Sequence, residues 1–296
     1  MPALAATALA ALALATTMIL LAGRSAGSPR TVTATSTSVL YPTEQLLIAY
    51  CMQANGFSFR PALTAPVSPE ELFPYGITSL AWARQHGFGR QLVADDQGPA
   101  TAYDNEYGVA LDGPGPNGPG VTVRVPTGEI DGHSTQGCRA YAEGVLYGNY
   151  ASWFKLDTVH SDLSQLVQQL VQQNPAYQES VSRWSHCMSG YGYSFGSPAA
   201  AMDHFLTCEP APAEADAVKV ASTESTCLSS VGMTGLIKQL TVTASSEVHK
   251  QYAAVLQAYD SAQRRAVPAA YKILGTLCKG KIQPSFVQIC DSFAVQ

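Results

Sequence analysis

Charged residues are scarce in this sequence, and their scarcity limits what the protein can bind. They make up 13% of the 296 residues, about half the usual share of a globular chain. The formal net charge is -5, and the basic residues do not gather into a patch that could hold phosphates or anionic lipid. We therefore expect a neutral polar surface and no nucleic acid partner.

Metal ligands at their usual spacings are also missing. The seven cysteines include no C-x-x-C pair, and the six histidines include no H-x-x-x-H pair. We expect neither a metal site nor another cofactor. The hydrophobic share of 46% is ordinary, so the chain can bury a sizeable core.

The start of the chain has the features of an export signal. Residues 1–22 are almost entirely apolar, and small residues suited to cleavage follow near Ala22 and Ala26. We predict a signal peptide over 1–26, a linker over 27–40, and an extracellular or cell-envelope location. Because Arg24 and Arg30 follow the apolar run and no basic residue precedes it, an uncleaved membrane anchor is the alternative. Seven cysteines favour export, since disulfides persist outside a reducing cytosol.

A short motif occurs twice and divides the mature chain into halves, 41–155 and 156–296. The pattern C-M-x-x-x-G-[FY]-S-F begins at Cys51 and again at Cys187. Each copy comes at the end of a helical pattern. Gly56 and Gly192 are expected to close these helices in a left-handed conformation. The rings that follow, Phe57 and Tyr193, are expected to fold back onto the helix just ended.

The repeat also predicts a disulfide framework. A further cysteine on a helical pattern follows each copy, so we pair Cys51 with Cys138 and Cys187 with Cys227. Cys278 and Cys290 would close a short C-terminal loop, and Cys208 would stay unpaired. In the chain-entropy model each bridge contributes about 3–4 kcal/mol.

Apolar periodicity and capping residues predict a mainly α fold. An apolar stripe over 163–171 indicates one helix, and another begins near Pro175. A capping box at 68–71 starts a short helix, and residues 77–86 form a further one that Gly87 stops. The amphipathic stretch 248–259 is predicted to continue until Pro268 interrupts it.

One region departs from the helical pattern. Residues 112–120, rich in Gly and Pro, must form a loop. The alternating run from Val121 is expected to be a strand, paired with residues 107–111 in a small β-hairpin.

Taken together, these motifs resemble a group of uncharacterised secreted or lipid-anchored actinobacterial proteins. The resemblance covers about residues 41–265 and includes Y-G-I-x-S-x-x-W-A-R-x-x-G-F-G from Tyr75, G-C-R-A-Y-A-E around Cys138, and W-S-x-C-M-x-x-x-G-Y from Trp184. It implies an extracytoplasmic location and paired cysteines, and it brings no activity. A lipobox ends in Cys, whereas Arg24 stands here, which argues against a lipid anchor.

Ser194 is the sharpest catalytic candidate, because residues 192–196 fit the G-x-S-x-G elbow of serine hydrolases. Asp216 and His249 would complete a triad in the order Ser, Asp, His. The other copy reads G-F-S-F-R from Gly56, so this serine is better explained as part of a repeated turn.

These observations favour a secreted or cell-envelope protein without enzymatic activity. Such a protein would bind a cell-wall component or a protein partner. The alternatives are a serine hydrolase using Ser194 and a membrane-anchored accessory subunit.

Overall fold

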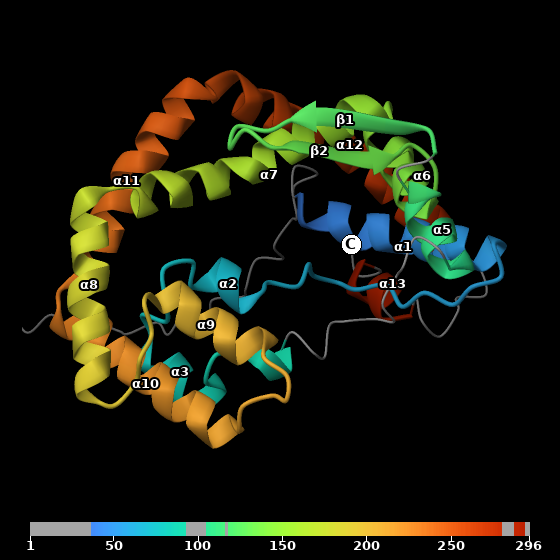
Figure 1. Ribbon diagram of the computed structural model, residues 1–296. Helices are drawn as coiled ribbons and strands as arrows, with labels where there is room; N and C mark the ends of the chain where they lie inside the picture. Colours follow the sequence, from blue (N-terminus) through green and yellow to red (C-terminus); the bar gives the residue numbers. More distant parts are fainter. Residues whose placement is uncertain (1–36, 93–104, 116–117, 280–286, 294–296) are drawn as a thin grey trace, which may run out of the picture. The chain divides into compact units, whose positions relative to one another are not determined.

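The computed structural model describes residues 37–92, 105–115, 118–279 and 287–293. The predicted signal peptide and most of the predicted linker lie outside these residues. The fold is mainly α, with one antiparallel hairpin and three disulfides, as predicted (Figure 1).

The first half of the chain contains shorter helices and the hairpin. Its elements are η1 (Thr37–Val39), α1 (Leu40–Ala54), α2 (Pro69–Leu72), α3 (Leu80–His86), α5 (Glu106–Asp112), β1 (Gly120–Arg124), β2 (Ile130–Ser134) and α6 (Cys138–Tyr147). Longer helices follow, namely α7 (Tyr150–Gln172), α8 (Pro175–Gly190), α9 (Pro198–Thr207), α10 (Glu214–Ser230), α11 (Met233–Gln251), α12 (Ala253–Leu277) and α13 (Val287–Phe293).

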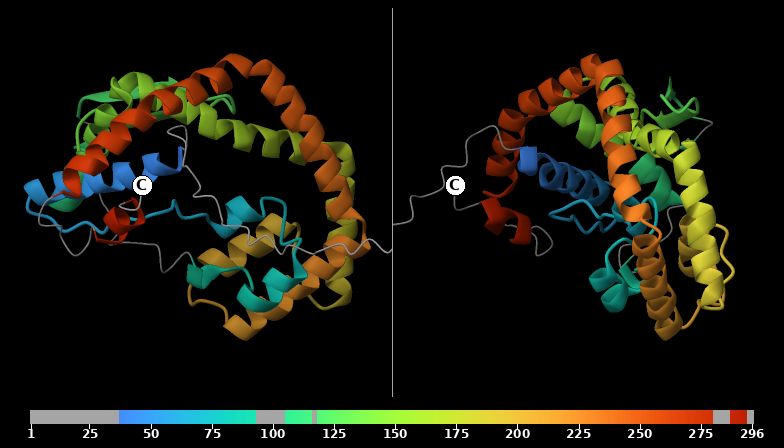
Figure 2. Two further views of the ribbon diagram at one scale, coloured as in Figure 1. Left: turned by 180° about the vertical axis from the view of Figure 1, so that it is seen from behind. Right: turned by 90° about the vertical axis from the view of Figure 1, so that its left-hand side faces the viewer.

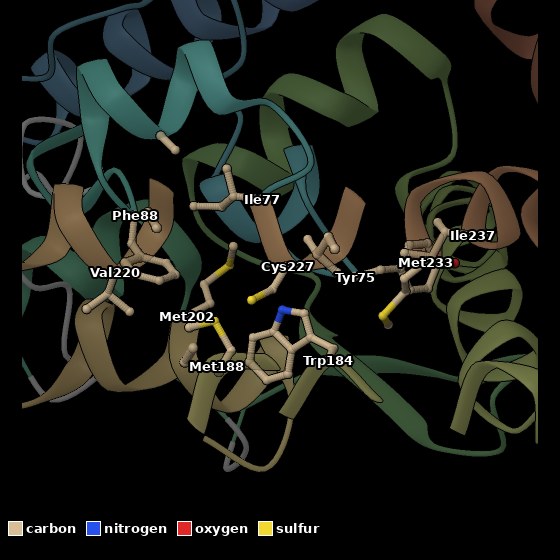
Figure 3. Close-up of a cluster of buried hydrophobic side chains, with 14 of the residues drawn as sticks. Tyr75, Ile77, Phe88, Trp184, Met188, Met202, Val220, Cys227, Met233 and Ile237 are labelled. Atoms are coloured by element: carbon tan, nitrogen blue, oxygen red, sulfur yellow. The ribbon is translucent and has the colours of Figure 1, made fainter. Parts of the chain in front are cut away.

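Two clusters of buried side chains form the core, and each draws on both halves of the sequence. The first cluster joins α1 and α6 to the C-terminal part of α12 and to α13. Figure 2 shows α1 beside α12, which it contacts. The second cluster joins residues 75–88 to α8, α9, α10 and α11 (Figure 3). The two predicted halves are therefore interleaved in the packing.

Helix α7 links the elements of the two clusters. It contacts α6, α12 and β1, and it also contacts α8 and α11. The helix runs without a break through residues 155 and 156, where the two predicted halves meet. Its predicted apolar stripe buries Leu163 and Val171, while Leu170 is more exposed.

The predicted disulfides are confirmed. Cys51 pairs with Cys138, Cys187 with Cys227, and Cys278 with Cys290, and Cys208 has a free thiol. In Figure 3, Cys227 lies near Trp184 in the second cluster. Both side chains are fully buried, so this bridge is part of the core packing.

The two copies of the cysteine motif end their helices in the same way. Gly56 has φ of +85° and Gly192 has φ of +87°, as the motif predicts. The N–H of Phe57 then donates to the carbonyl of Met52, and the N–H of Tyr193 donates to that of Met188. These bonds turn the chain back onto the helix just ended.

The predicted hairpin partner is wrong. Residues 107–111 lie in α5, because the side chain of Asn105 accepts a hydrogen bond from the Gly108 N–H and starts a helix there. The strand from Val121 pairs instead with β2, and Val121 is opposite His133. The turn between the strands includes Gly128, with φ of +103°.

Two predicted helix limits also need correction. The helix expected over 77–86 begins at Leu80, because Ser79 caps it by accepting the Trp82 N–H. Pro268 does not interrupt its helix, since α12 continues through it to Leu277. The break comes earlier, at Tyr252, between α11 and α12. Pro268 is exposed, and its nitrogen cannot donate to the carbonyl of Arg264, so the helix loses one backbone hydrogen bond there.

Candidate functional site

Four helices bring together a group of acidic and aromatic side chains. Helix α1 supplies Glu44, α6 supplies Glu143 and α7 supplies Asp157. Helix α6 contacts α1 and α7, and all three helices contact α12. We call this group the acid–ring cluster, and its rings are Tyr147, Trp153, His160 and Tyr259. Its members are half-buried except for Trp153, which is buried.

The rings form a continuous stack across three helices. The centroids of Tyr147 and Trp153 are 3.5 Å apart, and those of Trp153 and Tyr259 are 5.4 Å apart. His160 lies on Tyr259 at 3.6 Å, with nearly parallel planes. The stack buries apolar ring faces and leaves polar edges beside the carboxyl groups.

Both glutamates have strongly raised pKa values. Burial raises the pKa of Glu44 to about 7. The positive charge of Arg139 lowers it, and the negative charge of Asp157 raises it slightly further. Burial also raises the pKa of Glu143 to about 8, helped by repulsion from Glu44 and Asp157. Arg139 and a hydrogen bond from Trp153 oppose that rise. At neutral pH Glu143 is therefore mostly protonated and Glu44 about half protonated, whereas exposed glutamates are ionised.

Asp157 and Tyr259 are joined by a hydrogen bond. Burial raises the pKa of Asp157, and the bond to Tyr259 lowers it. Burial and the Asp157 charge raise the pKa of Tyr259 to about 12, so its hydroxyl stays protonated. The Gln263 amide donates to the same hydroxyl at 2.7 Å, which fixes the ring edge.

A polar cavity of about 380 Å³ adjoins the cluster on the hairpin side of α7. Its described lining consists of Val125, Glu129, Ile130, Asp131, Asp157, Thr158, Ser161, Asp162 and Gln165. Asp157 thus belongs both to the cavity and to the acid–ring cluster.

Asp162, which lines this cavity, attaches the turn of the hairpin to α7. Its two carboxylate oxygens accept from the backbone N–H and the hydroxyl of Thr127, each at 2.8 Å. This carboxylate is buried, and both of its oxygens already accept hydrogen bonds from Thr127. Among the acids that line the cavity, Glu129 and Asp131 are the exposed ones.

The chemistry of this region suits recognition of a polar ligand. Carboxylates accept hydrogen bonds from ammonium and hydroxyl groups, while neutral carboxylic acids such as those in the cluster can donate. In the parts of the chain that the structure describes, no three His, Cys, Asp or Glu side chains lie close enough together to hold a metal ion.

The residues of the predicted triad lie on separate elements. Ser194 is exposed in the loop between α8 and α9, Asp216 is exposed in the first turn of α10, and His249 is exposed in the last turn of α11. Helix α8 precedes the serine where a nucleophile elbow requires a strand. Within the described residues, no hydrogen bond joins any two of the three.

The free thiol and one histidine have defined neighbours. The sulfur of Cys208 lies 3.2 Å from Nδ1 of His204, one helical turn earlier. His133 lies in β2, and its Nδ1 is 2.7 Å from the hydroxyl of Tyr150.

Sequence reasoning missed the acid–ring cluster. The available signal was a lone acid in an otherwise uncharged helix, since Glu44 is the one charged residue of α1. A second signal was the spacing of Arg139 and Glu143, which places opposite charges one turn apart. Neither signal says that α1, α6, α7 and α12 meet.

Comparison of the chain with protein-family models, curated proteins and solved structures finds no match. None of the helices described in the structure combines the length and the apolar character that crossing a membrane requires.

Proposed function

We propose that this is an exported binding protein of the cell envelope, without enzymatic activity, whose ligand carries amino and hydroxyl groups. The main support for this proposal is the polar cavity between the hairpin and α7. Its lining combines four acids with the side chains of Thr158, Ser161 and Gln165. A fragment of cell wall with a free amine has the matching chemistry.

The disulfides support the exported location. Three bridges link residues separated by 87, 40 and 12 positions, and two of them tie core helices together. Such bridges persist where thiols are oxidised. The apolar leader at 1–26 supports the same location, and mass measurement of the mature protein tests whether it is removed.

Titration calorimetry with two matched ligands tests the binding. We expect muropeptides with a free amine to bind, and muropeptides with that amine acetylated to bind at least about tenfold more weakly, because the acids lose their ionic partner. Binding should weaken at high salt. Equal affinity for the two ligands, or no heat with either, contradicts the proposal.

Variants locate the binding to the cavity. The double variant Glu129→Gln, Asp131→Asn removes two exposed acids of the rim and should weaken binding about fivefold. Asp216→Asn is the matched control, because it removes an exposed acid on α10 and should leave the affinity unchanged. A loss of affinity in the control would show a nonspecific charge effect.

The same samples test the absence of catalysis. Mass spectrometry of the muropeptides after prolonged incubation should find them intact. Cleavage that disappears in Glu143→Gln would instead assign acid–base chemistry to the acid–ring cluster, since its raised pKa suits a general acid.

A further inference from the structure

The disulfide between Cys51 and Cys138 lies in the wall of a cavity of about 720 Å³. The rings of Phe57 and Tyr141 line the same cavity, and Tyr141 is 48% exposed. A cysteine-containing peptide could therefore reach the sulfur atoms and place apolar side chains against these rings.

The two sulfur atoms have different environments. Cys51 is half-buried near the C-terminal end of α1, whereas Cys138 is 1% exposed and is the first residue of α6. The N-terminal end of a helix stabilises a thiolate, and no side chain caps this end of α6. The Asn55 amide nitrogen lies 3.8 Å from both sulfurs and can donate to either.

The charged groups near the bridge have opposite effects on the stability of a thiolate there. Glu106 is the charged side chain in the described lining of the cavity, and it disfavours a thiolate there. Arg139 follows Cys138 directly, but its guanidinium is engaged with Asp112 at 2.5 Å. The helix end and Asn55 are therefore the groups that favour a thiolate at Cys138.

The bridge between Cys187 and Cys227 provides an internal comparison. Both cysteines lie in the last turn of their helices, α8 and α10, where the carbonyl ends disfavour a thiolate. Burial disfavours a thiolate at Cys227 and at Cys138 alike, because they are 0% and 1% exposed, so the two bridges differ in their helix ends. Of the six paired cysteines, only Cys138 begins a helix.

We propose that the Cys51–Cys138 bridge exchanges with thiols of cysteine-containing peptides. The thiolate of the peptide attacks Sγ of Cys51 and forms a mixed disulfide with it. The bond between the two protein sulfurs breaks, and its electron pair stays on Cys138 as a thiolate at the start of α6. Return attack by Cys138 on Cys51 expels the peptide thiolate and restores the bridge. A second thiol of the same peptide would instead release Cys51, leaving the peptide oxidised and both protein cysteines reduced.

Graded reaction of the native full chain with reduced glutathione tests this assignment. A Cys208→Ser background prevents exchange with the free thiol. After alkylation and peptide mapping, we expect glutathione on Cys51 and the alkyl group on Cys138. This bridge should open at least about fivefold faster than Cys187–Cys227, because the better leaving thiolate departs faster. Earlier opening of another bridge, glutathione on Cys138, or simultaneous opening with loss of helical signal would overturn the proposal.

A titration of the two buried thiols tests the physical cause. In Cys51→Ala the thiolate absorbance of Cys138 should report a pKa below the ordinary value of about 8.5. In the matched variant Cys187→Ala the pKa of Cys227 should lie above it. A pKa of Cys138 at or above the ordinary value would reject the role of the helix end. Where Cys51→Ala loses its helical signal, the glutathione mapping decides alone.

Discussion

At the scale of single residues, the most unusual group is the buried carboxyl of Glu224. It is fully buried in the second cluster, and one of its oxygens accepts from the N–H of Ile77 at 2.7 Å. The other oxygen has no hydrogen-bond partner among the described residues. Burial raises the pKa of Glu224 to about 8, although the bond from Ile77 lowers it, so the group is mainly neutral at pH 7.

Two substitutions separate the charge of Glu224 from its hydrogen bond. Glu224→Gln keeps an acceptor for Ile77 and cannot ionise, so its stability relative to the native protein should rise between pH 5 and pH 8. Glu224→Ala also removes the acceptor and leaves a void, and it should cost about 2–4 kcal/mol. Urea unfolding of the three proteins at both pH values measures these differences. A Gln variant whose relative stability does not change with pH would contradict the raised pKa.

Gly76 makes the close packing around Glu224 possible. Its φ is +106°, and an added Cβ would lie 2.6 Å from Cβ of Pro198 and 2.7 Å from Oε1 of Glu224. Gly128 has nearly the same φ, +103°, and open space around it. Gly128→Ala should therefore cost only the backbone strain, about 1–2 kcal/mol. Gly76→Ala should cost at least about 2 kcal/mol more, because Pro198 or the carboxyl must also move. Equal losses in thermal unfolding would show that the contact is easily relieved.

At the scale of helices and strands, local sequence signals predicted the individual elements better than they predicted which elements pair with one another. Apolar periodicity placed the helix that begins at Pro175, and the capping box at Ser68 is present with both of its hydrogen bonds. The repeat paired the cysteines correctly. The helix and the cap were predicted because each depends on residues within a few turns of one another, whereas the cysteine pairing followed from the repeated motif.

Features that depend on distant contacts could not be predicted in this way. No local signal in the strand from Val121 selects Ile130–Ser134 as its partner over residues 107–111. The Asn105 cap excludes residues 107–111, because it starts a helix there. The acid–ring cluster likewise needs Glu44, Glu143 and Tyr259 to meet, although 215 residues separate the first from the last (259 minus 44). An amphipathic pattern shows which face is buried, but it does not identify the helix that covers it.

Two exposed prolines, one inside a helix and one at the start of a helix, allow the stability cost of a proline inside a helix to be measured. Pro268 lies inside α12, where it cannot donate to the carbonyl of Arg264, and Pro175 is the first residue of α8, where no donor is needed. Pro268→Ala should stabilise the protein by about 1–2 kcal/mol, after the more flexible unfolded chain offsets part of the gain. Pro175→Ala should change stability by less than about 0.5 kcal/mol. Denaturant midpoints measure both, and a destabilised Pro268→Ala would mean that the packing of α12 requires a bend there.

At the scale of the whole molecule, the buried carboxyl groups couple folding to pH. Glu44, Glu143 and Glu224 have pKa values near 7, 8 and 8 in the folded chain, against 4.5 in the unfolded chain. Between these limits the folded state holds protons that the unfolded state has lost. Folding stability must then fall as pH rises through this range. His160 acts the other way, because burial lowers its pKa and stability is lost when it is protonated.

We expect the free energy of unfolding to be at least about 2 kcal/mol larger at pH 5.5 than at pH 8, because each shifted unit of pKa contributes up to about 1.4 kcal/mol. Urea denaturation at a series of pH values measures this slope. The double variant Glu44→Gln, Glu143→Gln removes the interacting pair that faces Arg139 and Asp157, and it should flatten the slope. Asp203→Asn, an exposed acid on α9, is the control that should leave it unchanged. Stability that rises toward pH 8 would mean that the glutamates ionise normally, and the four helices would then have to separate enough to admit water around them.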